Sequence, residues 1–123
     1  MLLLVDDNTE QLELRRMVLE REGFAVATAT TAGEAREQCG GCCAVVMDLR
    51  LPSLGDGLAL IRDLHARLPE APIVVLAGLP EELRGHPEQR LVHEVLRKGS
   101  GTGILVELLR KLAGPAPKPV ISQ

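Results

Sequence analysis

The chain has 123 residues, of which 46% are hydrophobic and 25% charged, and its formal net charge is −3. This length supports one hydrophobic core but not two, and the composition is that of a folded soluble domain. The acidic balance without a Lys/Arg cluster argues against nucleic acid as a direct partner, and the apolar runs are too short to cross a membrane. Without a signal-like segment, we expect a cytoplasmic protein.

Short apolar runs alternate with amphipathic segments five times, which predicts five strands separated by helices. The predicted strands are residues 2–5, 25–29, 44–48, 73–76 and 94–97. The first, third and fourth are apolar on both faces, as strands are when helices cover both sides of a parallel sheet. We therefore predict an α/β fold, a doubly wound (βα)5 flavodoxin-like sandwich with a parallel five-stranded sheet of order 2-1-3-4-5.

The first two helices are predicted from apolar spacing and from a capping pattern. The first spans about Thr9–Glu22 and has apolar residues at helical spacing. These residues are Leu14, Met17 and Val18. The second begins at "TAGE", where Thr31 as N-cap and Glu34 three residues later have the form of a capping box.

The later part of the chain predicts two more helices and an irregular connection. One helix follows Gly57 and ends at Pro69, and the last spans roughly Thr102–Leu112. Their apolar residues are Leu58, Ile61, Leu64 and Leu68 in one, and Ile104, Leu105, Leu108, Leu109 and Leu112 in the other. The segment Pro80–Arg90 is polar and interrupted by a glycine and a proline, so any helix there should be short, broken or mobile.

These elements make residues 1–113 one domain. Residues 114–123, "GPAPKPVISQ", are rich in proline and are predicted to be a disordered tail or a linker. Such a chain can be a stand-alone protein or a part of a larger one.

Three cysteines, Cys39, Cys42 and Cys43, lie close together in "CGGCC". An odd number at this spacing fits a reducing compartment better than a disulfide framework. Structural zinc requires four ligands, and neither a second cysteine pair nor a nearby histidine is present. We therefore interpret this stretch as a Gly-rich loop leading into a strand.

Acidic residues follow two of the predicted strands. Asp6 and Asp7 follow the first strand, and Asp48 ends the third. Ligands of doubly wound sheets lie outside the carboxyl ends of the strands, and these two strands are predicted neighbours. Like charges that close raise one another's pKa or require a cation, and an all-oxygen acidic set suits Mg²⁺. Helix capping by Asp7 or Asn8, and a turn at Asp48, are alternative uses, but capping explains one acid and not three.

Lys98 follows the fifth predicted strand and should emerge at the same edge of the sheet. Its ammonium group there would neutralise part of the carboxylate charge and reach a bound phosphoryl oxygen. A solvated lysine beside Arg97 is the alternative, which would be preferred if Lys98 stood alone.

The stretches "LLLVDD", "VVMDLRLP", "PIVVLAG" and "LRKG" occur together in this order. In order and spacing they resemble the receiver domains of two-component response regulators, which are CheY-like proteins. The resemblance covers the chain up to the tail.

The resemblance implies that Asp48 is the phosphoacceptor, which attacks the phosphohistidine of a sensor histidine kinase or a phosphotransfer protein. It also implies Mg²⁺, ligated by Asp7, Asp48 and the backbone carbonyl of Arg50, with Asp6 acting through a metal-bound water. Lys98 would bridge to the acyl phosphate. Such a domain catalyses only its own phosphorylation and dephosphorylation and is not otherwise an enzyme.

The chain departs from the family pattern at several positions. Ala77 stands where the family has a serine or threonine whose hydroxyl contacts the phosphoryl group. Val95 replaces an aromatic residue that changes rotamer on activation, and Gly99 replaces a proline. One extra residue is present between Pro52 and Gly57. The charged chemistry is therefore retained, while the conformational relay is altered.

Three functions are compatible with these observations. The first is a phosphorylated signalling switch or relay, which the set Asp6, Asp7, Asp48 and Lys98 favours. The second is a pseudo-receiver, an interaction or dimerisation module without regulated phosphorylation, which Ala77 and Val95 favour. The third, an enzyme or flavin protein on the same fold, is weakest because neither a Gly-rich phosphate loop nor an aromatic pair is present. We prefer the first.

Overall fold

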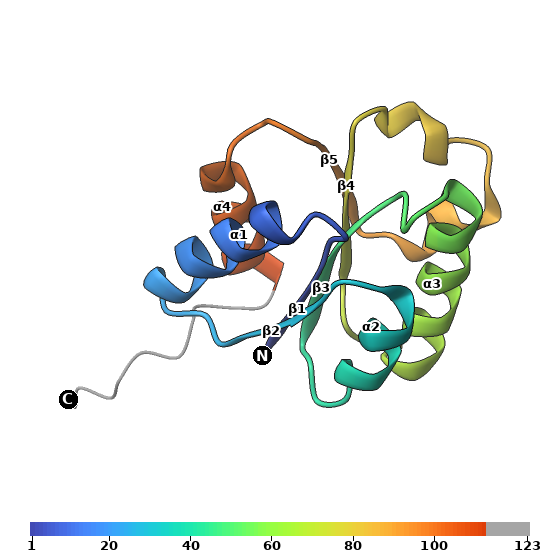
Figure 1. The fold of residues 1–123 in the computed structure, drawn as a ribbon. Coiled ribbons are helices and arrows are strands. Elements are labelled where there is room, and N and C mark those ends of the chain that lie inside the picture. The colour runs from blue at the N-terminus through green and yellow to red at the C-terminus, as the bar shows by residue number, and fades with distance from the viewer. Residues whose placement is uncertain (113–123) are drawn as a thin grey trace.

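The computed structural model describes residues 1–112, which form a central sheet with helices on both faces (Figure 1). The elements are β1 (Leu2–Val5), α1 (Thr9–Arg21), β2 (Val26–Ala29), α2 (Ala32–Gln38), β3 (Ala44–Asp48), α3 (Leu54–Arg67), β4 (Ile73–Ala77), η1 (Pro80–Leu83), η2 (Pro87–Leu91), β5 (Glu94–Arg97) and α4 (Thr102–Leu112). The elements η1 and η2 are short 3-10 helices. The predicted alternation of strands and helices is confirmed.

All strands of the sheet are parallel, and their order is β2-β1-β3-β4-β5, as predicted. Val5 on β1 pairs with Met47 on β3. Asp6 follows Val5 and Asp48 follows Met47, so this register places the two aspartates side by side at the carboxyl edge. Lys98 follows β5 at the same edge, because parallel strands all end on one side of the sheet.

Two hydrophobic layers hold the helices against the sheet. Alternate residues of β1 belong to different layers: Leu3 and Val5 pack with α2 and α3, whereas Leu2 and Leu4 pack with α1 and α4. Figure 1 shows these two helix pairs on opposite faces of the sheet. Burial on both sides is the reason why the central strands are apolar at nearly every position.

Side-chain caps begin α1 and α2. The side chain of Asn8 accepts a hydrogen bond from the backbone N–H of Gln11 at 3.0 Å, so that Asn8 and not Asp7 caps α1. Thr31 accepts one from the N–H of Glu34 at 3.1 Å, which confirms the predicted N-cap of α2. The carboxylate of Glu34 reaches back to Thr30, at 2.7 Å from its N–H, instead of to Thr31. The capping box is therefore formed only in half.

The prediction for the buried face of α1 was wrong for two of its three residues, whereas Val18 is half-buried and packs against the layer of α1 and α4. Leu14 and Met17 are exposed, and Leu12 and Leu19 are buried against the sheet. Arg15 lies on the same side as the two buried leucines, because residues 12, 15 and 19 are spaced by three and four. Because the charged Arg15 interrupts the buried stripe, the apolar pattern of the sequence indicated the side of Leu14 instead.

Two details of the later helices also differ from the prediction. α3 begins at Leu54, before Gly57, because the side chain of Ser53 accepts a hydrogen bond from the N–H of Asp56 at 3.1 Å and caps the helix there. On α4, Ile104 is exposed although it belongs to the predicted apolar set. The extent of α4 agrees with the prediction.

The connection between β4 and β5 consists of η1 and η2, which confirms the expectation of a short, broken helix. Gly85, with φ of +86°, reverses the chain between them in a conformation that favours glycine. Ion pairs attach both pieces to the body of the domain. Arg50 pairs with Glu82 of η1, and Arg62 of α3 pairs with Glu88 of η2.

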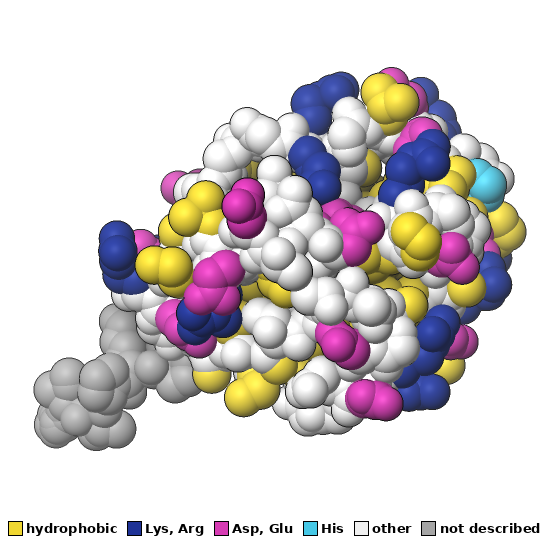
Figure 2. Space-filling model, viewed as in Figure 1, with side chains coloured by type: hydrophobic (Ala, Val, Ile, Leu, Met, Phe, Trp, Pro, Cys, Tyr) yellow, Lys and Arg dark blue, Asp and Glu magenta, His cyan; other side chains and the backbone are white. Residues whose placement is uncertain are grey.

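The "CGGCC" stretch forms the connection from α2 to β3, where Cys39 and Cys42 are buried and Cys43 is exposed, all as free thiols. The predicted tail, residues 114–123, lies outside the described residues. Within residues 1–112, no helix has the length and hydrophobicity needed to span a membrane. The face seen in Figure 2 has acidic and basic side chains next to one another rather than a field of one sign.

Gly57 allows α3 to pack directly against the backbone that follows Asp48. A Cβ atom at Gly57 would lie 1.6 Å from the carbonyl oxygen of Leu49. We expect Gly57→Ala to lower the free energy of unfolding by about 3 kcal/mol, as severe overpacking does. Urea denaturation followed by circular dichroism measures this loss.

Gly55→Ala is the matched control on the same helix, because the nearest atom to its new Cβ would be Ser53 Oγ at 3.9 Å. It should be neutral or stabilising, since alanine favours the helix. Equal losses in the two variants would contradict the close approach of α3 to Leu49.

Candidate functional site

Three carboxylates meet at the carboxyl edge of the sheet. Asp6, Asp7 and Asp48 each offer an oxygen, and these oxygens lie within 4.8 Å of one another. Asp6 and Asp48 are buried, at 1% and 4% exposure, whereas Asp7 is exposed. Asn8 caps α1, so the carboxylate of Asp7 is available to the pocket that it lines. The structure thus brings together the three acids predicted from the sequence.

Lys98 lies at the same site. Its Nζ is 3.0 Å from Oδ2 of Asp48, and its backbone N–H donates to the carbonyl of Ala77 at 2.9 Å. Gly99 follows with φ of +89°, a conformation that proline cannot adopt. The loop after β5 therefore leaves the sheet by a path that a proline at this position would not permit.

Asp6 is held by two donors of this chain. Oδ1 accepts a hydrogen bond from the N–H of Asn8 at 2.8 Å, and Oδ2 accepts one from Nη1 of Arg15 at 2.6 Å. Sequence reasoning missed Arg15. The signal that could have found it is an arginine spaced three and four residues from Leu12 and Leu19, on the buried stripe of α1.

The two buried carboxylates differ in their ionisation. Burial raises the pKa of Asp48 to about 7, and the nearby Asp6 adds to this rise while Lys98 opposes it. Burial also disfavours the charged form of Asp6. The proximity of Asp48 and the donors Asn8 and Arg15 nevertheless hold the pKa of Asp6 below its usual value. Asp6 therefore stays ionised while Asp48 takes up a proton near neutral pH.

The site fits a hard divalent cation. Within residues 1–112, Oδ1 of Asp48 is buried and has no hydrogen-bond partner. An orphaned carboxylate oxygen is costly, and a cation among Asp6, Asp7 and Asp48 would satisfy it. A set of carboxylate oxygens with one exposed member is the kind of site that Mg²⁺ occupies with part of its water shell.

The pocket above Asp48 contains two of the other positions singled out in the sequence, Arg50 and Ala77. Arg50, Ala77 and Lys98 line it together with Glu82 of η1. The side chain of Arg50 pairs with Glu82, with Nε 3.2 Å from Oε1. Ala77 presents only a methyl group here. Val95 is half-buried and packs against the hydrophobic layer under α2 and α3.

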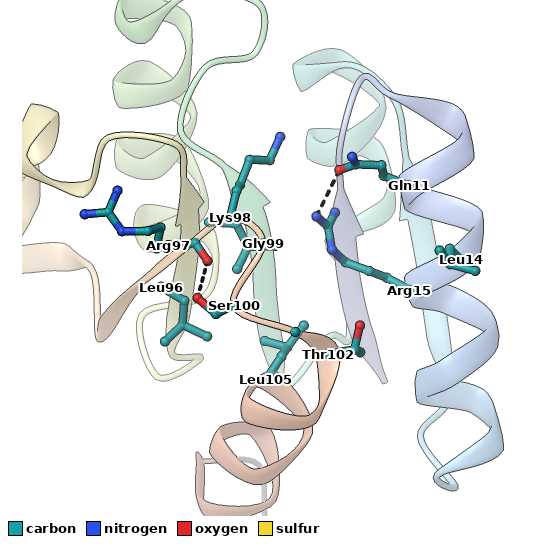
Figure 3. A pocket seen from close by; sticks show the side chains of 12 residues that line it. Gln11, Leu14, Arg15, Leu96, Arg97, Lys98, Gly99, Ser100, Thr102 and Leu105 are labelled. Atoms are coloured by element: carbon teal, nitrogen blue, oxygen red, sulfur yellow. Dashed lines mark hydrogen bonds between the residues drawn. The ribbon is translucent and has the colours of Figure 1, made fainter.

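A second hollow lies on the other side of Lys98, between α1 and the loop that joins β5 to α4 (Figure 3). Gln11, Leu14 and Arg15 line it from α1, and the loop lines it opposite them. The Arg15 side chain thus forms part of the wall between this groove and the acidic cluster. One of its guanidinium nitrogens donates to Oε1 of Gln11 at 3.2 Å.

Residues 2–110 match the model of the family described as "Response regulator receiver domain". The chain belongs to this family. The receiver domain has curated relatives among bacterial regulators. It is 42% identical over 79 residues to the photosynthetic apparatus regulatory protein RegA of Rhodobacter capsulatus, an alignment that covers 63% of this chain and 42% of RegA. The receiver domain therefore spans less than half the length of that relative.

Solved structures of receiver domains have the same fold. The response regulator TrrA of Thermotoga maritima, in complex with Mg²⁺-BeF, matches with a TM-score of 0.79 at 26% identity and covers 90% of this chain and 96% of its own. A response regulator of Burkholderia pseudomallei, with a phosphorylated aspartic acid, calcium ion and citrate, matches with a TM-score of 0.76 at 28% identity. The match covers 90% of this chain and 65% of the Burkholderia chain. Both confirm the predicted family and fold.

The raised pKa of Asp48 predicts a pH dependence of stability in the metal-free receiver domain. Folding raises this pKa from 3.8 to about 7, so the native state binds the proton more tightly. The free energy of unfolding should therefore fall as the pH rises through this window. Asp48→Asn cannot titrate, and it should lose this part of the dependence and exceed the parent in stability above the window.

Urea denaturation in EDTA, below and above the window, measures the effect. Asp63→Asn on α3 is the control, and it should keep the parental decrease because it leaves Asp48 in place. A parental decrease that persists in Asp48→Asn would assign the titration to another group.

Proposed function

We propose that this receiver domain accepts a phosphoryl group onto Asp48 from a phosphohistidine, in a reaction that requires Mg²⁺. The observation that carries the proposal is the state of the Asp48 carboxylate. One oxygen is paired with Lys98, and the other is buried without a partner among residues 1–112, beside two further carboxylates. A nucleophile, a cation and an acidic cluster in one pocket suit phosphoryl transfer.

In this proposal a carboxylate oxygen of Asp48 attacks phosphorus, and an acyl phosphate forms. The bond from phosphorus to the imidazole nitrogen breaks, and its electron pair leaves with the histidine. Bound Mg²⁺ supplies positive charge that keeps Asp48 ionised and neutralises the phosphoryl oxygens. Lys98, now 3.0 Å from Asp48, would transfer its contact to a phosphoryl oxygen.

The metal would be held by residues that the fold already places at this edge. We assign Asp7, Asp48 and the backbone carbonyl of Arg50 as ligands, with Asp6 acting through a water. Asp7 suits this role because it is exposed and Asn8, not Asp7, caps α1. Arg50 suits it because it lines the same pocket two residues after Asp48.

The partner in this proposal is a sensor histidine kinase or a phosphotransfer protein, as is general for receiver domains. The neighbours described above support the chemistry, since one contains a phosphorylated aspartic acid and another Mg²⁺-BeF. Free thiols at all three cysteines suit the reducing cytoplasm, where we place the reaction.

Signalling after phosphorylation would use a route other than the usual one. Ala77 has no hydroxyl to bind the phosphoryl group, and Val95 has no aromatic ring to change its rotamer. The ion pair between Arg50 and Glu82 instead joins the segment after Asp48 to η1.

A second candidate function, a pseudo-receiver that binds partners without regulated phosphorylation, is favoured by the absence of the hydroxyl at Ala77.

Incubation with acetyl phosphate and Mg²⁺ tests the proposal. The parent should gain the mass of one phosphoryl group, and hydroxylamine should remove it because the product is an acyl phosphate. Asp48→Asn should gain no mass, and Asp7→Ala should gain little because it lacks a metal ligand. Intact-mass spectrometry measures all three.

Two results would redirect the interpretation. Labelling that persists in Asp48→Asn would reject Asp48 as the acceptor. A folded parent that neither gains a phosphoryl group from acetyl phosphate nor binds beryllofluoride would favour the pseudo-receiver. Asp63→Asn, a surface change on α3, should be labelled like the parent.

Ala77 predicts a gain of function. A hydroxyl at this position, which lines the pocket beside Asp48, would donate a hydrogen bond to a phosphoryl oxygen. Such a bond to a charged acceptor contributes about 1.5–3 kcal/mol. Ala77→Ser and Ala77→Thr should therefore bind beryllofluoride with Mg²⁺ more tightly than the parent does, as measured by calorimetry.

Serine adds less bulk than threonine, so it separates the hydroxyl effect from crowding at a buried position. Tighter binding by Ala77→Ser alone would indicate crowding by the threonine methyl group. If both variants fold and neither binds more tightly, Ala77 does not face the phosphoryl group.

A further inference from the structure

Arg15 introduces a second cation into the acidic site, opposite Lys98. Its Nη1 lies 2.6 Å from Oδ2 of Asp6, and its side chain is only 16% exposed. Lys98 pairs with Asp48 in the same way. Of the three clustered carboxylates, the two buried ones therefore each have a cation of this chain, while Asp7 is exposed to solvent.

The position of Arg15 is fixed by the fold and not by chance contact on a surface. It lies on the buried stripe of α1 between Leu12 and Leu19, and its guanidinium is also held by Gln11 (Figure 3). Arg16, the next residue, has different partners. It pairs with Glu13 and Glu20 on the outer surface of the helix and does not contact the acidic cluster.

The positive charge of Arg15, paired with Asp6, weakens the attraction of the site for a second cation. Counted as formal charges, the three carboxylates and the two cations sum to one net negative charge, whereas without Arg15 the sum would be two. A divalent ion that enters is attracted by this net charge and repelled by the guanidinium. Because the pair is nearly buried, solvent screens this repulsion little.

We propose that Arg15 is an internal counter-ion that competes with Mg²⁺ for Asp6, so that it stabilises the metal-free protein and weakens metal binding. This inference rests on the proposed function, because it concerns the same metal site. It assigns Arg15 a positioning and tuning role: the residue touches neither the phosphoryl group nor the metal, and acts through Asp6. Arg15 and Mg²⁺ are then alternative means of neutralising one carboxylate.

The experiment measures the affinity for Mg²⁺ by calorimetry in the parent, Arg15→Gln and Arg15→Leu. Glutamine removes the charge but retains a donor, and leucine removes the charge but keeps an apolar side chain in the groove that Leu14 and Leu105 also line. Either variant should bind Mg²⁺ about tenfold more tightly, since removal of a charge within a few ångströms shifts ionic equilibria by at least this factor. Arg16→Gln, the matched control, should stay within about twofold of the parent.

Thermal unfolding separates this role from a merely structural one. Both Arg15 variants should melt below the parent in EDTA, because Asp6 is left buried without its cation, and should regain most of the loss in saturating Mg²⁺. A merely structural role would lower the melting temperature equally with and without Mg²⁺ and would leave the affinity unchanged.

The outcomes distinguish this inference from the proposed function. A parent that binds no Mg²⁺ would overturn both. A parent that binds Mg²⁺, with Arg15 variants that bind no more tightly, would overturn the inference alone. Variants that fail to fold even in saturating Mg²⁺ would also overturn it, because the metal should then take over the neutralisation of Asp6.

Discussion

Asp48 ends the central strand of the sheet with a carboxylate that is 4% exposed, in a position where charge is costly. The surrounding elements act on this charge in opposite ways, because the Asp6 carboxylate adds to the cost and Lys98 reduces it. The register of β1 against β3 places Asp6 beside it, the chain after β5 brings Lys98 to 3.0 Å, and Gly57 lets α3 approach the backbone next to it. Burial still raises its pKa to about 7, so one oxygen remains in need of a cation or a proton.

The two layers of the domain contribute differently to this edge. The layer of α2 and α3 supplies packing and the close approach at Gly57, whereas the layer of α1 and α4 supplies charge through Arg15. Arg15 and Lys98 come from separate elements and pair with different carboxylates, Arg15 with Asp6 and Lys98 with Asp48. The acidic cluster is therefore nearly balanced by the chain's own side chains. In the proposed function, its affinity for a divalent ion would depend on how firmly those side chains are held, and not only on the number of acids.

In the proposed function, the phosphoryl chemistry and the relay depend on different residues of the domain. The acids and Lys98 depend on the ends of β1, β3 and β5, which the sheet holds rigidly. The relay of the family depends on a hydroxyl and an aromatic ring, and Ala77 and Val95 supply neither. The ion pair of Arg50 with Glu82 joins the segment after Asp48 to η1, in a connection made of two 3-10 helices rather than one regular helix.

Much of this architecture was predictable from the sequence. Apolar runs separated by amphipathic segments indicated the parallel sheet, and the position of the acids after the strands indicated where they converge, because parallel strands end at one edge. The order 2-1-3-4-5 is one of two orders common in doubly wound sheets, and the apolar pattern alone does not select it. The buried face of α1 was not predictable, since Leu14 and Leu12 offer competing stripes and only contact with the sheet selects one. The pairing of Arg15 with Asp6 and of Arg50 with Glu82 was likewise decided by tertiary structure. These partners come from different elements, and no local pattern of spacing specifies which side chains the packed helices and loops bring together.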